Sequence, residues 1–165
     1  MTLLAKDVMT SEVVTVLPDT PLREVITILE DNSFSGIPVV DESNRIVGIA
    51  SETDILHYTQ QVIGHPIKKP YELLKQNMEV LHVNALHRGV ELIELVASAS
   101  IEKLMSRNVI SVQENTSIKK VVESMHEHNI NRVPVVSNDG EITGLISRED
   151  IIRALSDNWH DFTDN

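Results

Sequence analysis

The sequence predicts a mixed fold of the α/β class (α+β type), in which one β-α-β-β-α unit occurs twice. Residue n aligns with residue n + 96 from Met9 to Ile55 without a gap, and 13 of these 47 pairs are identical. In both copies, short β-branched runs that favour strands alternate with stretches whose apolar residues recur at helical spacing. The chain is therefore an internal duplication, and its 165 residues suffice for two small units that share a core.

Each copy is expected to open with a short strand, at residues 13–16 and 109–112, followed by an amphipathic helix. We expect Thr20 to be the N-cap of the first helix and Pro21 its first residue, because proline tolerates the missing N–H there; Thr116 is the corresponding cap. Buried strands are expected at residues 37–40 and 133–136, and further strands at residues 45–50 and 141–146 after polar turns. A last helix then begins at Ser51 and at Ser147.

Residues 60–99 have no counterpart in the duplication. Within them, residues 71–82 and 88–99 carry apolar side chains at helical spacing, which predicts two packing helices rather than a linker. We therefore divide the chain into a first repeat (residues 3–59), a helical insert (60–99), a second repeat (100–156) and an acidic tail (157–165). Two interpretations of the insert stay open: it covers apolar faces of the repeats or a dimer contact, or it docks a separate protein.

Composition narrows the classes of function. A net charge of −11 disfavours binding to nucleic acid or to anionic membranes, because both are negatively charged. The chain has no cysteine, which excludes disulfides, thiol nucleophiles and thiolate metal sites. The first residues lack the apolar core of a signal peptide, and no stretch approaches the roughly 20 apolar residues of a membrane span. We therefore expect a cytoplasmic protein.

No arrangement of residues predicts catalysis or a metal centre. The Gly-x-x-x-x-Gly-Lys loop of P-loop enzymes and the Gly-x-Ser-x-Gly elbow of α/β-hydrolases are both missing. His126 and His128 are two residues apart and face different sides of an expected helix, and His82 and His87 are poorly matched at five apart. The sequence thus predicts a protein that is not an enzyme and requires no cofactor.

One ordered series of motifs occurs in both copies. Val8-Met9 or Leu104-Met105 precedes the first strand, a Pro-Val-Val strand follows the helix, and Gly-x-x-Ser-x-x-Asp comes last. This series, repeated without a gap, resembles a tandem pair of cystathionine-β-synthase (CBS) domains, also called a Bateman module. The resemblance implies that the repeats pack about a pseudo-two-fold axis and leave two clefts. It also implies that the clefts bind adenine nucleotides or related adenosyl ligands, and that two such pairs form a homodimer.

The resemblance assigns roles to the residues that match the family's motifs. Asp150 and Asp54 would accept hydrogen bonds from the ribose hydroxyls, and Ser147 and Ser51 would lie beside the ribose or the phosphate. The favoured site consists of Asn131, Arg132, Ser147 and Asp150 with Val14, Val16 and Pro38. The second cleft consists of Ser35, Ser51, Thr53 and Asp54 with Ile110, Val112 and Pro134.

The chemistry of these residue types suits an adenosyl ligand. A carboxylate offers two acceptor oxygens to the vicinal 2′ and 3′ hydroxyls, and an arginine holds a phosphate in two charged hydrogen bonds. Gly36 replaces Arg132 in the first copy, so we expect the second cleft to hold charged ligands more weakly. A structural interpretation coexists with this one, because Ser-x-x-Asp at a helix start is also a capping box.

These observations predict a regulatory module that senses an adenosyl ligand and signals to a partner protein. The expected ligand is AMP, ADP or ATP, with S-adenosylmethionine and NAD as further candidates. An alternative stays open, in which the chain is a structural or interaction module with empty or vestigial clefts that acts through the inserted helices.

Overall fold

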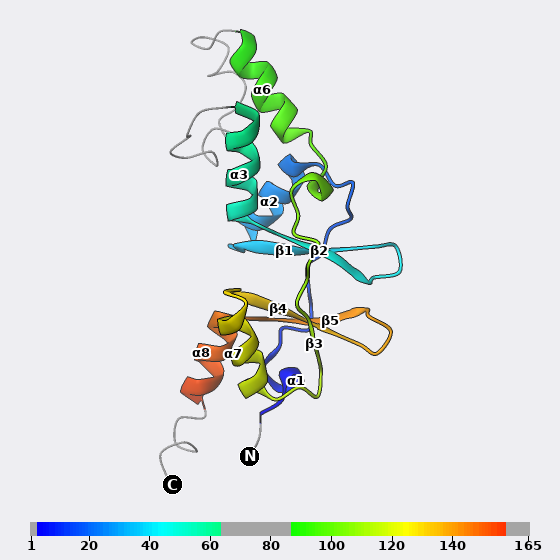
Figure 1. Ribbon diagram of the computed structural model, residues 1–165, viewed down its shortest axis with the longest axis vertical. Coiled ribbons are helices and arrows are strands. Elements are labelled where there is room, and N and C mark those ends of the chain that lie inside the picture. The colour runs from blue at the N-terminus through cyan, green and yellow to red at the C-terminus, as the bar shows by residue number, and fades with distance from the viewer. Residues whose placement is uncertain (1–2, 64–86, 158–165) are drawn as a thin grey trace. The chain divides into compact units, whose positions relative to one another are not determined.

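The computed structural model describes residues 3–63 and 87–157, which form two compact units (Figure 1). Among these described residues, unit 1 comprises those within Met1–Val14, Glu42–Ile46 and Asn108–Asn165, and unit 2 comprises those within Thr15–Asp41 and Val47–Arg107. Both contain helices and a small sheet, and their elements follow the repeated order expected from the sequence. The predicted α/β fold is therefore confirmed.

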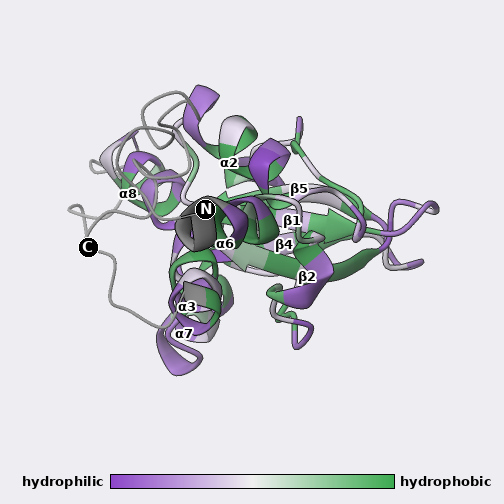
Figure 2. Ribbon diagram, turned by 90° about the horizontal axis from the view of Figure 1, so that it is seen from above, coloured by the Kyte–Doolittle hydropathy of each residue, from purple (hydrophilic) through white to green (hydrophobic). Residues whose placement is uncertain are grey.

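Unit 2 holds most of the first copy. Strand β1 (Gly36–Val40) pairs with β2 (Ile46–Ser51), and an isolated parallel bridge joins Val16 to Val39. Of the strand expected at residues 13–16, only this single bridge at Val16 is observed. Helix α2 (Leu22–Asp31) packs on β1, and α3 (Glu52–Ile63) follows β2 directly. Much of β1 and β2 is hydrophobic (Figure 2). The fully buried side chains of this core include Leu22, Val25, Leu29, Ile37, Val39 and Ile55.

Helix α6 (His87–Ala97) completes unit 2 by packing against both α2 and α3. Val96 is fully buried in the core, and an ion pair at 2.5 Å between Arg23 Nη2 and Glu94 Oε1 joins α2 to α6. A single 3-10 turn, η1 (Ile101–Lys103), follows. The helix expected over residues 88–99 is thus found at His87–Ala97, whereas the helix expected over residues 71–82 lies outside the described residues.

Unit 1 holds most of the second copy, around a three-stranded sheet. Its central strand β4 (Arg132–Val136) is parallel to β3 (Val112–Gln113) and antiparallel to β5 (Ile142–Ser147). The strand expected at residues 109–112 is therefore observed only as β3, which begins at the last of these residues. Helices α7 (Ile118–Glu127) and α8 (Arg148–Asp157) correspond in the duplication to α2 and α3. Helix α1 (Ala5–Val8) contacts both α8 and β5. Fully buried core side chains include Ala5, Val121, Val133, Val135 and Ile146.

The leading segment of each copy packs on the second strand of the other copy. In unit 1, Thr10 and Leu145 exchange two backbone hydrogen bonds of 3.0 Å, and Met9 covers Gly144 so closely that a Cβ there would lie 2.2 Å from the Met9 sulfur. In unit 2, Met105 covers Gly48 in the same way, at 2.4 Å from such a Cβ. Each compact unit therefore contains segments of both copies. The division into repeats at residues 3–59 and 100–156 stays a prediction from the duplication.

The predicted N-caps of α2 and α7, Thr20 and Thr116, are each wrong by one residue. Pro21 is the N-cap of α2, and the hydroxyl of Thr20 instead accepts a hydrogen bond of 3.1 Å from the N–H of Leu17, three residues earlier. In α7, Ser117 is the N-cap, while Thr116 makes the corresponding upstream bond. Threonine hydroxyls readily bond nearby backbone groups in this way. Each threonine therefore closes the turn before its helix, and the cap moves one residue on.

Candidate ligand-binding site

The predicted acceptor Asp150 lies in the first turn of α8, immediately after the end of β5. The strand register places Arg132, the first residue of β4, opposite Ser147, the last residue of β5. The N–H of Arg148 donates a hydrogen bond of 3.1 Å to the carbonyl of Asn131. Four residues predicted for the favoured site, Asn131, Arg132, Ser147 and Asp150, therefore meet at one end of the β4–β5 pair.

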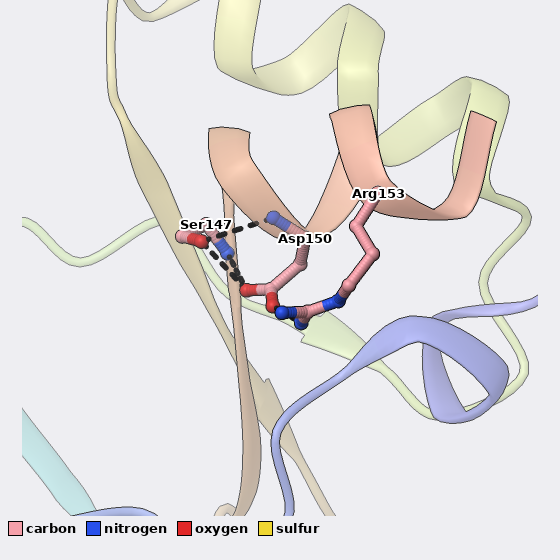
Figure 3. A network of polar contacts seen from close by, with 3 residues as sticks. All are labelled: Ser147, Asp150 and Arg153. Carbon is pink, nitrogen blue, oxygen red and sulfur yellow. Dashed lines mark hydrogen bonds and ion pairs between the residues drawn. The ribbon is translucent and has the colours of Figure 1, made fainter. Parts of the chain in front are cut away.

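A capping box holds Asp150 in place, as the Ser-x-x-Asp spacing predicts. The N–H and the hydroxyl of Ser147 both donate to Asp150 Oδ2, at 2.8 and 2.6 Å (Figure 3). The N–H of Asp150 donates back to Ser147 Oγ at 3.2 Å. This arrangement satisfies backbone groups at the start of α8 and places a negative charge where the helix dipole favours it. The capping interpretation is therefore confirmed at this position.

Unit 2 contains the same construction around Asp54. The N–H and hydroxyl of Ser51 donate to Asp54 Oδ2 at 2.8 and 2.5 Å, and the N–H of Asp54 donates to Ser51 Oγ at 3.3 Å. The N–H of Glu52 donates to the carbonyl of Ser35 at 3.2 Å, which reproduces the contact between Arg148 and Asn131. Ser35, Ser51 and Asp54 are therefore brought together as predicted for the second cleft.

One contact at Asp150 is absent from the expectations drawn from the sequence. The guanidinium of Arg153 donates to Asp150 Oδ1, the oxygen that the capping box leaves unused (Figure 3). Only 10% of the Asp150 side chain is exposed, compared with 60% of the Arg153 side chain. The sequence signal for this contact is the spacing of Asp150 and Arg153, because residues three apart on a helix lie on one face.

The remaining predicted residues are divided between the two units. Unit 1 contains Val14, Ile110, Val112 and Pro134, and unit 2 contains Val16, Pro38 and Thr53. Pro38 and Pro134 are buried in β1 and β4, whereas Thr53 is exposed on α3. Each predicted ligand set therefore draws on both units, and its complete membership stays a prediction.

Within residues 3–63 and 87–157, no three acidic or histidine side chains are placed to hold one metal ion. No helix in these ranges has both the length and the apolar character that crossing a bilayer demands. A pocket of about 290 Å³ in unit 1 is lined by Lys6, Gln113, Ser137 and their neighbours, at the far end of β4 from Arg132. It contains none of the predicted ligand residues.

Comparison with known proteins identifies the family. The family model described as "CBS domain" matches residues 5–60 and 101–157, which together are more than half of the chain. The chain belongs to the CBS domain family. The two matches make it a tandem CBS pair, as the resemblance in its motifs indicates.

Several relatives resemble this CBS pair over nearly its whole length. Protein MJ1426 of Methanocaldococcus jannaschii is 28% identical over 93% of the chain and 91% of that protein. The CBS domain pair of protein MJ0100, solved in complex with 5′-methylthioadenosine and S-adenosyl-L-methionine, is 25% identical with a TM-score of 0.67; the match covers 96% of this chain and 99% of that one. The CBS domain of a CBS domain containing membrane protein from Sphaerobacter thermophilus is 26% identical with a TM-score of 0.71, over 92% and 87% of the two chains.

Other relatives are covered only in part by this chain. The chain covers 15% of a homoserine O-acetyltransferase of Methanocorpusculum labreanum, at 32% identity over 71 residues. It covers 43% of protein MJ1404 of Methanocaldococcus jannaschii, at 30% identity. The chain thus spans less than half the length of these curated relatives, and their names do not describe what the CBS pair does.

Proposed function

We propose that this CBS pair is a regulatory module that binds an adenosyl ligand and signals its presence to a partner protein. The observation that carries the proposal is the pair of capping-box carboxylates, Asp150 and Asp54, at equivalent positions of the two copies. The MJ0100 pair, which shares the fold at 25% identity, was solved with two adenosyl compounds. In this role the module is not itself a catalyst.

The residues around Asp150 suit a nucleotide better than a nucleoside. A carboxylate accepts hydrogen bonds from ribose hydroxyls, and Arg132 at the neighbouring strand end supplies a permanent positive charge for a phosphate. The first turn of α8 favours an anion for the same reason that it favours the aspartate. We therefore propose AMP, ADP or ATP as the ligand at Asp150, with S-adenosylmethionine and NAD as alternatives.

Titration calorimetry with AMP, ADP, ATP and adenosine tests this assignment. A charge-assisted hydrogen bond contributes about 1.5 to 3 kcal/mol, so Arg132→Ala is expected to weaken nucleotide binding by about one to two orders of magnitude. Adenosine has no phosphate, and its affinity is expected to stay unchanged. Lys103→Ala removes an exposed positive charge in unit 2 and is the matched control. Equal nucleotide affinities for wild type and Arg132→Ala would rule out the role given to Arg132.

An interaction module without a ligand is the competing proposal. The two are separated by thermal unfolding in the presence of each candidate compound, because a ligand that binds only the folded state stabilises it by RT ln(1 + [L]/Kd). A rise in melting temperature with AMP, ADP, ATP, NAD or S-adenosylmethionine supports the sensor. Unchanged melting temperatures with all five favour the interaction module.

A second copy of the chain is the partner that the helix surfaces support. In unit 2, α6 covers α2 and α3, and Ile26 and Thr59 are buried. The equivalent positions of unit 1, Val122 on α7 and Leu155 on α8, are 42% and 40% exposed, and Ile152, which is also on α8, is 68% exposed. We propose that a second copy covers this apolar face and forms the homodimer, because no described element of the chain does so.

A further inference from the structure

The two capping boxes differ in how many acceptor positions they leave open. A carboxylate has about four lone-pair positions on its two oxygens. At Asp150, Ser147 uses two positions on Oδ2 and Arg153 uses one on Oδ1. At Asp54, Ser51 uses the two on Oδ2, and Oδ1 accepts no hydrogen bond from any side chain or backbone group of residues 3–63 and 87–157. Within the described part of the chain, one oxygen of the Asp54 carboxylate therefore accepts no hydrogen bond, whereas both oxygens of the Asp150 carboxylate accept at least one.

The difference comes from one position of the repeat. Arg153 and His57 are 96 residues apart and therefore correspond in the duplication; each follows its aspartate by three residues. Arginine is permanently charged and presents a fork of several donors on a long side chain, whereas histidine has a shorter side chain with only two ring nitrogens. Asp150 is buried beneath the exposed guanidinium, but Asp54 is only half-buried. Arg153 therefore both restricts access to Asp150 Oδ1 and adds a positive charge beside this carboxylate.

We propose that Arg153 is a specificity-determining residue, which makes the site at Asp150 select phosphorylated adenosyl ligands over uncharged ones. The inference rests on the proposed function and adds a second ligand class, because the site at Asp54 is left for uncharged adenosyl compounds. Two physical effects carry it. Ribose hydroxyls that bind Asp150 compete with the guanidinium for Oδ1, which weakens the binding of every riboside. The same guanidinium balances the charge of Asp150, so that a phosphate held near Arg132 meets less repulsion.

The size of the effect follows from the exposure of the ion pair. Most of the Arg153 side chain is exposed to solvent, and such pairs are weak because water screens them and the long side chain loses freedom. We therefore expect the competition to change affinity about two- to fivefold rather than by orders of magnitude.

Titration calorimetry with adenosine and AMP measures this selection. The background variant Asp54→Ala removes the other carboxylate, so that binding reports on Asp150. Adding Arg153→Met is expected to strengthen adenosine binding about two- to fivefold and to leave AMP binding unchanged or weaker, so the preference for AMP falls. Arg153→Lys keeps the positive charge and is expected to retain part of this preference. Lys103→Met, which removes one positive charge in unit 2, is expected to leave both affinities unchanged.

The reciprocal variant tests the other copy. In an Asp150→Ala background, His57→Arg is expected to weaken adenosine binding about two- to fivefold, because it introduces the competitor that unit 2 lacks. If a background variant fails to fold, as judged by its circular dichroism and melting curve, Arg153→Met and His57→Arg in the otherwise natural chain give the same comparison from a two-site fit. A ratio of AMP to adenosine affinity that Arg153→Met leaves unchanged would overturn the role of Arg153 alone. Failure of both compounds to bind the natural chain would overturn the proposed function with it.

Discussion

A methyl group added at Gly144 would collide with Met9. The Cβ of an alanine there would lie 2.2 Å from the sulfur, 2.8 Å from Cγ and 3.1 Å from Cβ of Met9. The methionine tip can move, but its Cβ is fixed by the backbone bonds between Thr10 and Leu145. We therefore expect Gly144→Ala to lower the free energy of unfolding by about 1 to 3 kcal/mol, the usual cost of overpacking. Urea unfolding followed by circular dichroism measures this change.

A double-mutant cycle shows which methionine covers Gly144. Met9→Ala removes the obstacle, so the combined variant is expected to lose less stability than the sum of the two single losses, by about 1 kcal/mol. Met105→Ala is the matched control, because Met105 covers Gly48 in the other unit and is expected to combine additively with Gly144→Ala. Additive losses for Met9, or coupling to Met105 instead, would refute the exchange of leading segments between the copies.

A glycine with a different role provides a second control. Gly140 has a φ of +83° and no atom within 4 Å of an added Cβ. Alanine there is expected to lower the free energy of unfolding by about 1 kcal/mol through backbone strain alone. Because no side chain opposes the methyl group, Met9→Ala is expected not to relieve this loss.

Two further predictions concern the capping box and the apolar face of unit 1. Ser147→Ala removes two hydrogen bonds of the capping box and is expected to lower the free energy of unfolding by about 1 kcal/mol; a urea midpoint equal to that of wild type would contradict this. Ile152→Glu places a charge on the exposed face of α8 and is expected to halve the mass in solution, measured by sedimentation equilibrium, without changing the melting of the monomer. A charge-reversal control, Asp157→Lys, changes an exposed residue of α8 that is five positions from Ile152 and therefore lies on a different side of the helix. This control is expected to leave the mass unchanged, and an unaltered mass for Ile152→Glu would exclude the apolar face as the dimer contact.

The duplication made most of the fold predictable. Thirteen identities at one fixed spacing indicated two copies of the same unit, and within residues 3–63 and 87–157 apolar periodicity located the expected helices and the buried strands to within a few residues. The exchange of leading segments could not be predicted, because a gapless repeat is symmetric. Met9 corresponds to Met105 in the duplication, and Gly48 corresponds to Gly144. The alignment is therefore the same whichever methionine covers which glycine.

The site was predictable to the extent that it depends on local spacing. Ser-x-x-Asp at a helix start has one common geometry, and both copies adopt it. The contact of Arg153 with Asp150 depends on the conformation of a long side chain, which the spacing allows but does not determine. Thr20 shows the opposite case, in which a favourable cap residue bonds to the preceding turn instead.

The central claim is that the capping-box carboxylate of α8 also receives the ribose of an adenosyl ligand. Titration calorimetry of AMP into the natural chain and into Asp150→Ala tests it most directly, with a melting curve for each to establish that both are folded. We expect the loss of the charged acceptor to weaken AMP binding at one site by at least about tenfold. Binding of AMP with the same affinity and stoichiometry in both proteins would contradict the claim and leave Asp150 as a helix cap.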